Sequence, residues 1–426
     1  MIDITLIREQ KELVKENIRK KFQDDKLSLV DEVFEMDQEF RQLKTRGDEL
    51  RSQRNTISKQ IGALIGQGKN EEAEKAKAEV KKIGEEISEN EIKEDDLQAN
   101  IKDLMLVIPN IIDDTVPLGV DDSENVELER FGEATIPEYD IPYHVDIMET
   151  LNGVDLDSGR KVSGNGFYYL MGDIARLHSA ILSYARDFMI DKGFTYCIPP
   201  FMIRSEVVTG VMSFAEMENM MYKIEGEDLY LIGTSEHSMI GKYIDTILSE
   251  DKLPQTMTSY SPCFRKEVGA HGIEERGVYR IHQFEKQEMI VVCKPEESKD
   301  WFEKLYRHTV EIFCSLDIPV RALECCSGDL ADLKVKSVDI EAWSPRQQKY
   351  FEVGSCSNLG DAQARRLGIR VNGEQGKYFA HTLNNTVVAP PRMLICFLEN
   401  NYQEDGSVLI PEALQPYMGG KKVLKP

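Results

Sequence analysis

Charged and aromatic side chains recur at every second position of the segment YRIHQFEKQEM, residues 279–289. Alternate residues of an extended strand point to the same side of a sheet. This segment is therefore expected to carry one row of such side chains on a single face: Arg280, His282, Phe284, Lys286 and Glu288. For one strand alone, a solvated outer face is the ordinary interpretation.

A second strand-like segment repeats the pattern just upstream, because Arg265 and Glu267 also share a face. Residues 268–277, a loop that contains glycines and charges, join the two segments. Two neighbouring strands of this kind look more like a ligand surface than a solvated face. Arginine binds phosphate through a fork of donors, phenylalanine offers a plane on which a base can stack, and carboxylates hold amino groups or Mg²⁺. The chemistry fits a nucleotide.

Later segments add further oxygen-bearing side chains. Asp339, Glu341 and Trp343 share a face, and Glu352 and Ser355 lie in another strand-like run. Carboxylates beside a serine suit a hard cation that bridges phosphates. A third run carries Asn384 and Thr386 and leads to Arg392, where a helix over 392–400 is expected. The chain has no GxxxxGK[ST] motif and no strand-coupled GxGxxG, so P-loop and Rossmann sites are not expected.

The elements that must position these residues alternate between helix and strand. A helix is expected over 176–192, and a strand-like stretch, FTYCIPPFMI, follows, in which Pro199 and Pro200 mark an edge or boundary strand. Six further strand candidates precede the helix at 392–400, which indicates an α+β domain on a mainly antiparallel sheet. We place this domain at 143–426 and a turn-rich, acidic linker at 109–142.

The first 108 residues have a different pattern. Apolar residues recur in heptads along 33–64 and again along 73–104, and a Gly-rich turn at 66–70 lies between the two runs. This pattern predicts an antiparallel coiled-coil hairpin over about 27–104. Between residues 41 and 60, six basic side chains face two acidic ones: Arg41, Lys44, Arg46, Arg51, Arg54 and Lys59 against Asp48 and Glu49. A solvated helix face and a phosphate-contacting strip both explain this stretch.

Composition excludes several classes of protein. The chain has 426 residues and a formal net charge of −23, a balance typical of globular proteins, and no apolar run is long enough to cross a membrane. Charges near the start make a signal peptide unexpected. None of the eight cysteines forms a CxxC pair, so we predict no zinc and a reducing, cytoplasmic setting. The acidic total does not exclude nucleic acid, because binding needs only a local basic face.

Several of these segments together resemble a known family. The strings FRKE (264–267), RGVYRIHQFEKQE (276–288) and HTLNNTVVAPPRMLICFLEN (381–400) look like motifs 2 and 3 of class II aminoacyl-tRNA synthetases. Thr234-Ser235-Glu236 resembles the TSE element. With the N-terminal hairpin and the strings HQFxKxE and SCSNxxxxQAxR, the chain resembles the seryl-tRNA synthetase family over its whole length. The family's fold is a mainly antiparallel sheet flanked by helices.

The resemblance also implies a site. Arg265 would hold the ATP α-phosphate and the serine carboxylate, Glu267 the adenine amino group, and Phe284 and Arg392 the two faces of adenine. Glu352 and Ser355 would bind Mg²⁺. Glu288 and Thr386 would hold the serine hydroxyl, with Asn384 nearby and Thr234 and Glu236 at the amino group. Other positions implied by the motifs are Ser235 for serine, and Lys266, Arg280, Ile281, Val353 and Gly354 for ATP.

The family's reaction and partners follow as expectations. ATP and Mg²⁺ would activate L-serine, with Arg265 and Arg392 as catalytic residues, and the seryl group would pass to tRNA(Ser). Whether tRNA(Sec) is also served stays open. Residues 1–108 would form a tRNA-binding domain with contacts from Arg41, Lys44, Arg51 and Lys59, and Pro199 would lie at a homodimer interface.

Two alternatives remain. One is a paralogue that loads another acceptor, such as a carrier protein, and the other is a non-catalytic interaction protein. The hairpin argues against the first, and the retained Arg265, Glu267, Glu288, Glu352 and Arg392 argue against the second. The chain also departs from the family pattern at three places: residues 163–167, where a glycine replaces an arginine, residues 327–332, and Pro390-Pro391.

Overall fold

The computed structural model describes residues 1–267 and 277–426, and the chain divides into two compact units. One unit is Ile2–Pro109, and the other is Asn110–Pro426 together with Met1. The loop predicted at 268–277 lies outside the described residues except for Gly277. Among the helices that the structure describes, none combines the length and the apolar character that crossing a membrane requires.

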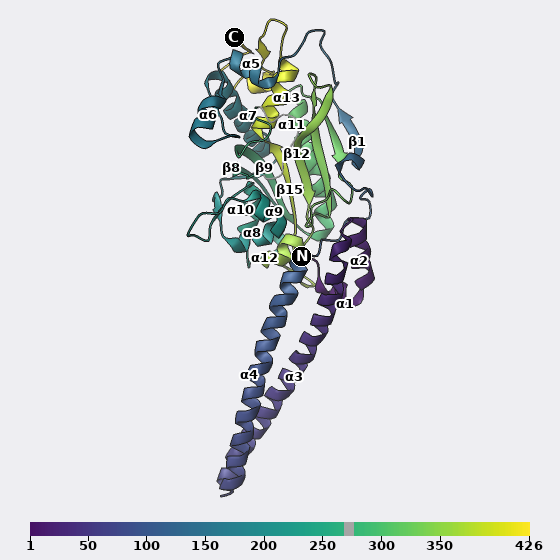
Figure 1. Ribbon diagram of the computed structural model, residues 1–426, viewed down its shortest axis with the longest axis vertical. Coiled ribbons are helices and arrows are strands. Elements are labelled where there is room, and N and C mark those ends of the chain that lie inside the picture. The colour runs from purple at the N-terminus through teal and green to yellow at the C-terminus, as the bar shows by residue number, and fades with distance from the viewer. Residues whose placement is uncertain (268–276) are drawn as a thin grey trace. The chain divides into compact units, whose positions relative to one another are not determined.

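The N-terminal unit is built from helices (Figure 1). Two short helices, α1 (Ile4–Glu9) and α2 (Lys11–Lys20), precede the long pair α3 (Leu27–Gly66) and α4 (Asn70–Val107). The long helices pack on each other over Leu50, Ile83 and Ile87. Gly47 and Asn90, two of the interruptions of the heptad pattern, meet in this pairing: a Cβ at Gly47 would lie 3.1 Å from the amide nitrogen of Asn90. Asn90 also donates to the Leu43 carbonyl at 3.0 Å.

The larger unit is organised by one eight-stranded sheet in the order β1-β10-β11-β12-β15-β9-β8-β4. Every pairing is antiparallel except β4 with β8, so the mainly antiparallel α+β prediction is confirmed. The strands are β1 (Val126–Phe131), β4 (Thr195–Cys197), β8 (Gln255–Phe264), β9 (Gln283–Cys293), β10 (Val320–Glu324), β11 (Lys336–Ser344), β12 (Lys349–Asn358) and β15 (His381–Val388).

Helices and small sheets surround this sheet (Figure 1). The helices are α5 (His144–Thr150), α6 (Leu156–Ser163), α7 (Gly172–Asp191), α8 (Ser205–Val211), α9 (Phe214–Met220), α10 (Ser235–Gly241), α11 (Ser298–Cys314), α12 (Ala362–Leu367) and α13 (Pro390–Asn401). Short strands form the sets β14-β13-β7, β16-β17, β2-β3 and β5-β6. Their bounds are β2 (Val154–Asp155), β3 (Tyr169–Leu170), β5 (Met202–Ile203), β6 (Tyr230–Leu231), β7 (Ile247–Ser249), β13 (Arg370–Gly373), β14 (Gly376–Phe379), β16 (Val408–Leu409) and β17 (Val423–Leu424).

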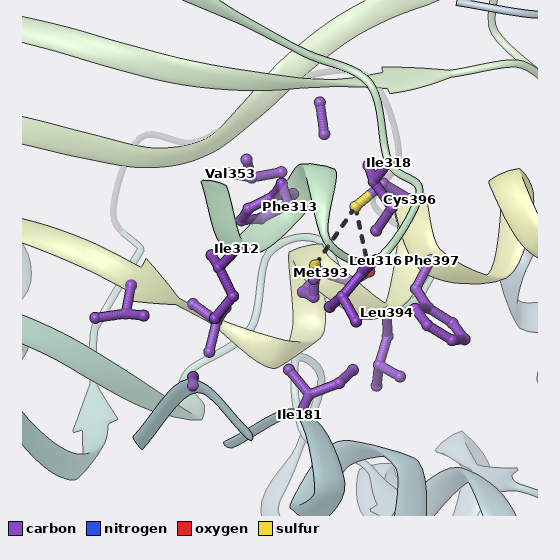
Figure 2. Packing of buried hydrophobic residues seen from close by; sticks show 14 of the residues in the cluster. Ile181, Ile312, Phe313, Leu316, Ile318, Val353, Met393, Leu394, Cys396 and Phe397 are labelled. Atoms are coloured by element: carbon purple, nitrogen blue, oxygen red, sulfur yellow. Dashed lines mark hydrogen bonds between the residues drawn. The ribbon is translucent and has the colours of Figure 1, made fainter. Parts of the chain in front are cut away.

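The main core lies where α7, α11 and α13 pack against one face of the sheet. Figure 2 shows Met393, Leu394, Cys396 and Phe397 of α13 in the same buried cluster as Phe313 of α11. Strand β9 contributes Met289 and Val291 to this core, whereas Ile290 and Val292 enter a second cluster on the opposite face. Lys286 and Glu288 lie on this same opposite face, nearer the start of β9. The face is therefore polar in the first half of the strand and apolar in the second.

Two segments differ from the sequence predictions. Residues 109–142 were expected to form a linker, but they contain β1, which pairs with β10 as an edge of the main sheet. The sequence VELERF lacks the apolar alternation typical of a strand, because β1 is an exposed strand at the sheet edge. Its Glu127 forms an ion pair with Arg321 of β10. Strand β9 begins at Gln283 rather than near Tyr279, so the alternation predicted from Arg280 holds only from Phe284 onward.

Candidate active site

A cavity of about 410 Å³ collects most of the residues that the sequence selected. Strands β9, β11, β12 and β15, the start of α10 and the start of α13 all contribute to its wall. Fourteen predicted residues line it: Thr234, Glu236, Arg265, Glu267, Ile281, Phe284, Glu288, Glu352, Val353, Gly354, Ser355, Asn384, Thr386 and Arg392. The strand faces inferred from alternate spacing therefore converge on one site.

One part of the cavity is lined by buried carboxylates and their partners. Glu288 is 1 % exposed and forms an ion pair with Lys286, two residues earlier on the same face of β9. Thr386 of β15 lies directly opposite Glu288 in the sheet register, and Asn384 is two residues away on the same strand. Their amide and hydroxyl groups face the cavity with the carboxylate, an arrangement that can bind a small polar molecule.

Arg265 follows the end of β8 and occupies the middle of the site. Its Nε donates to the Gly233 carbonyl at 3.2 Å, and its guanidinium lies 5.3 Å from the centre of the Phe284 ring. Behind it, His282 Nδ1 lies 2.9 Å from the Arg265 carbonyl and 3.1 Å from the Tyr222 hydroxyl. These contacts fix the backbone of Arg265, whose guanidinium lines the cavity and has further donors that can bind an anion.

A β-bulge brings Glu352 and Ser355 to the same face of β12. Residues three apart in a regular strand point to opposite sides of a sheet. Here Glu341 pairs with Glu352 while its neighbour Ile340 pairs with Gly354, so one residue of β12 is skipped. Val353 turns into the core at 2 % exposure, and Glu352 and Ser355 both reach the cavity.

Arg392 completes this side of the site from the first turn of α13. Its guanidinium lies 3.0 Å from the Glu352 carboxylate and 4.8 Å from the centre of the Tyr279 ring. Burial alone would raise the pKa of Glu352, but Arg392 and Lys334 hold it below its usual range. Pro390 opens α13, a position where proline has no N–H to lose, so the Pro390-Pro391 departure fits the local structure.

Several lining residues were given no binding role from the sequence, although Lys286 and Asp339 had been placed on the predicted polar faces. Lys286 and Tyr279 line the cavity, as do Lys334 and Asp339. Lys334 lies 3.4 Å from the Ser355 hydroxyl, and burial followed by the charge of Glu352 raises the pKa of Asp339 to about 6. The position of Lys286 on the predicted face of its strand was a usable sequence signal. Lys334 lies before β11 begins, so no strand alternation indicated that it would reach the cavity.

Some predicted residues lie elsewhere. Arg280 pairs with Glu267 at 3.6 Å but does not line the cavity, and the Lys266 ammonium contacts the Glu218 carbonyl at 3.3 Å. The Ser235 hydroxyl is fully buried and bonds to Ser259 at 2.6 Å. Pro199 follows the edge strand β4 outside the cavity.

The glycine departure near residue 166 is explained by packing. Gly166 has a φ of 78°, a left-handed conformation, and a Cβ there would lie 2.6 Å from the His282 ring. The Gly166 carbonyl accepts from the His282 backbone N–H at 3.0 Å. A side chain at this position would displace the histidine that fixes the backbone of Arg265.

The sheet and its polar cavity define a class II aminoacyl-tRNA synthetase. The model of the tRNA synthetase class II core domain (G, H, P, S and T) matches residues 220–401, and that of the seryl-tRNA synthetase N-terminal domain matches residues 1–112. The chain belongs to the seryl-tRNA synthetase family. A serine–tRNA ligase of Methanoculleus marisnigri is 40% identical over 100% of both chains, and one of Pyrococcus horikoshii is 41% identical over 100% of this chain and 98% of its own length.

Solved structures agree with this assignment. The structure of Pyrococcus horikoshii seryl-tRNA synthetase complexed with ATP has a TM-score of 0.95 at 40% identity over 100% of both chains. The serine–tRNA ligase of Naegleria fowleri in complex with AMP has a TM-score of 0.89 at 34% identity and covers 100% of this chain and 99% of its own. A Giardia lamblia prolyl-tRNA synthetase, 15% identical with a TM-score of 0.56 over 64% of this chain and 55% of its own, shares the fold.

Proposed function

We propose that this protein activates L-serine with ATP, releases pyrophosphate, and transfers the seryl group to the 3′ end of tRNA(Ser). The observation that carries the proposal is the convergence of Arg265, Phe284, Glu288, Glu352 and Arg392 on one cavity in a chain of this family. Such a set supplies cations for phosphates, an aromatic plane for a base and a carboxylate for a hydroxyl group.

The nucleotide is assigned to the part of the cavity that Phe284 and Arg392 line. Adenine stacks on Phe284, Arg392 covers its other face, and Glu267 accepts a hydrogen bond from the adenine amino group. Arg265 and the backbone of Ile281, Val353 and Gly354 complete this subsite, and Lys266 and Arg280 lie at its rim outside the lining. Arg392 would exchange its present partner, Glu352, for the nucleotide.

The amino acid is assigned to the carboxylate-lined part. Glu288 and Thr386 hold the serine hydroxyl, Asn384 lies beside them, and Thr234 and Glu236 hold the amino group, while Ser235 supports this turn from behind. A buried carboxylate left without a hydroxyl partner is costly, so alanine is rejected strongly. The extra methyl group of threonine must be excluded by shape.

The residues present fit Mg²⁺. Glu352 and Ser355 offer a carboxylate and a hydroxyl oxygen on the same face, and Asp339 opposite Ser355 adds a third hard oxygen donor. When bound, Mg²⁺ would neutralise phosphate charge beside Glu352 and Ser355. The catalytic work of the chain itself lies with Arg265, which orients the α-phosphate for in-line attack by the serine carboxylate, and with Arg392, whose charge helps to neutralise the phosphates while its plane covers adenine.

The hairpin is proposed to bind tRNA, so that residues 1–108 form a tRNA-binding domain around the coiled coil. Lys44 and Lys59 lie on α3 in the basic stretch together with Arg41 and Arg51. The two arginines are also held by carboxylates: Arg41 by Asp37 at 3.0 Å, and Arg51 by Asp48 at 2.9 Å. Pairing of this kind orients a guanidinium without removing all of its donors.

We also propose a cytoplasmic homodimer, with tRNA(Sec) as an acceptor to be tested beside tRNA(Ser). Pro199 lies next to the edge strand β4, and two apolar residues close to it in the sequence are exposed: Ile198 by 65 % and Met202 by 46 %. Exposed apolar side chains grouped beside a sheet edge support an interface there.

The first test is charging of purified tRNA with labelled serine, with threonine and alanine in parallel. Serine-selective charging in the presence of ATP and Mg²⁺ is the expected result. Serine-dependent pyrophosphate exchange without charging would instead favour the carrier-protein acceptor. The absence of both activities would favour the non-catalytic interaction protein.

A further inference from the structure

A buried glutamine, Gln363, connects the cavity to the helices behind it. It lies on α12 and is fully buried, at 0 % exposure. Its amide nitrogen donates to the Glu236 carboxylate at 2.7 Å and to the Val211 carbonyl at 3.3 Å, and its oxygen accepts from the Thr382 hydroxyl at 2.6 Å. None of the roles given above uses this side chain.

The orientation of the Gln363 amide is determined by its neighbours. The Val211 carbonyl can only accept a hydrogen bond, so the nitrogen of the amide must face it. The second N–H of that nitrogen is then directed at Glu236. Gln363 therefore offers the carboxylate a donor and cannot offer it an acceptor, which favours the ionised form of Glu236.

We propose that Gln363 is a positioning residue that holds the Glu236 carboxylate, ionised, where the ammonium group of the amino-acid substrate binds. The inference rests on the proposed function, because it takes Glu236 as the partner of that ammonium group. An ammonium binds well to a fixed anion and poorly to a neutral carboxylic acid. Gln363 acts through Glu236 and does not line the cavity itself.

The charges around Glu236 make this support necessary. Lys286 and Glu288 of β9 approach from the sheet, Lys334 from the segment before β11, and His237 follows on the same helix, where burial lowers the histidine pKa to about 3 and keeps the ring neutral. Burial raises the pKa of Glu236 to about 7; the Gln363 hydrogen bond lowers it, and the charge of Glu288 raises it. Without Gln363, the carboxyl group would stay protonated to a higher pH.

The test is the pH profile of kcat/KM for serine in pyrophosphate exchange, measured for Gln363→Met. Methionine keeps the length of the side chain and removes the donor. Because Glu236 must be deprotonated, a raised pKa moves the acidic limb of the profile to higher pH. A rise of one unit gives about a tenfold loss below neutral pH that disappears at alkaline pH, with the KM for ATP unchanged.

A matched control is Gln287→Met. Gln287 is also a buried glutamine, 1 % exposed, but it bonds to Thr258 at 2.7 Å and does not line the cavity. A merely structural role for Gln363 predicts that both variants lose activity equally at every pH. The positioning role predicts that only Gln363→Met moves the acidic limb. If Gln363→Met does not fold, Thr382→Val removes the donor to the Gln363 oxygen and should move the same limb less far.

The failures can be told apart. Wild-type protein without serine-dependent exchange would overturn the proposed function and this inference with it. An active Gln363→Met protein whose acidic limb coincides with that of the wild type would overturn the inference alone. An equal displacement in Gln287→Met would overturn it as well, because the effect would then not depend on contact with Glu236.

Discussion

At the scale of single residues, the cavity holds its charges in opposite pairs. Lys286 neutralises Glu288, and Arg392 neutralises Glu352. Buried charges are tolerated only when they are paired and hydrogen-bonded. We expect substrate binding at such a site to be an exchange of partners, in which Arg392 leaves Glu352 for the nucleotide. Removing one member of a pair therefore costs more free energy than the lost contact alone, because the other charge stays buried without a partner.

Arg265→Ala should abolish adenylate formation. Arg265 is the cation between the Phe284 ring and the Gly233 carbonyl, and it is proposed to neutralise the α-phosphate. Loss of such a donor costs about 10²–10³-fold in rate. Serine-dependent pyrophosphate exchange is the measurement. Lys266→Ala is the control: the Lys266 ammonium contacts the Glu218 carbonyl and does not line the cavity, so this variant should keep pyrophosphate exchange within a few fold. Near-normal exchange in Arg265→Ala would contradict the assignment.

Lys286→Met should weaken the binding of serine far more than that of ATP. The substitution leaves the Glu288 carboxylate, 1 % exposed, without its counter-ion. Loss of a charged partner in a buried site costs about 1–3 kcal/mol, which corresponds to a rise of about five- to 150-fold in the KM for serine. The preference for serine over alanine should also fall. Steady-state exchange kinetics with serine and alanine test this, and an unchanged ratio of the two kcat/KM values would refute it.

At the scale of elements, the sequence predicted which segments form strands better than it predicted where a strand begins or where a bulge interrupts it. Period-two spacing placed Phe284, Lys286 and Glu288 on one face correctly. The same rule failed for Arg280, because residues 277–282 are not a strand and Tyr279 and Ile281 reach the cavity instead. The bulge at Val353 has no sequence signal, yet it alone brings Glu352 and Ser355 to one face. Gln363 lay in a motif quoted for the family, but only its contacts identify its role.

The hairpin was predictable because heptads encode it directly. Its core is thin, so single side chains carry much of its stability. Leu50→Ala empties the contact of Leu50 with Ile83 and Ile87, and truncation of a buried leucine costs about 2–5 kcal/mol. We expect faster amide hydrogen exchange in the middle of α3 and α4, with pyrophosphate exchange unchanged. Ile92→Ala is the matched control, because Ile92 is 59 % exposed on α4. Equal rates of amide hydrogen exchange in Leu50→Ala and Ile92→Ala would contradict this account of the core.

At the scale of the whole molecule, charge is distributed unevenly along the chain. The chain carries a formal charge of −23, yet residues 41–60 hold six basic and two acidic side chains. Phosphate contacts contribute affinity that depends on salt, and each contact on a single strand adds about −0.7 to the slope of log K against log salt. An acidic protein with one basic strip is therefore expected to bind tRNA at that strip and to repel it elsewhere.

Lys44→Gln combined with Lys59→Gln should weaken tRNA charging without affecting serine activation. Both residues lie on α3 in the basic stretch, and neither lines the cavity. If each contacts one phosphate, the double variant should raise the KM for tRNA and reduce the salt slope by about 1.4. Pyrophosphate exchange, which needs no tRNA, should stay at the wild-type rate.

The control for this pair removes the same charge from the other long helix. The control variant combines Lys75→Gln with Lys81→Gln. Both lysines lie on α4, and the side chain of Lys81 is 81 % exposed. A general effect of net charge would change the salt slope equally in both double variants. A specific phosphate-contacting strip on α3 changes it only in the first. Equal loss of exchange and charging in the α3 variant would mean that these lysines support the fold rather than bind the acceptor.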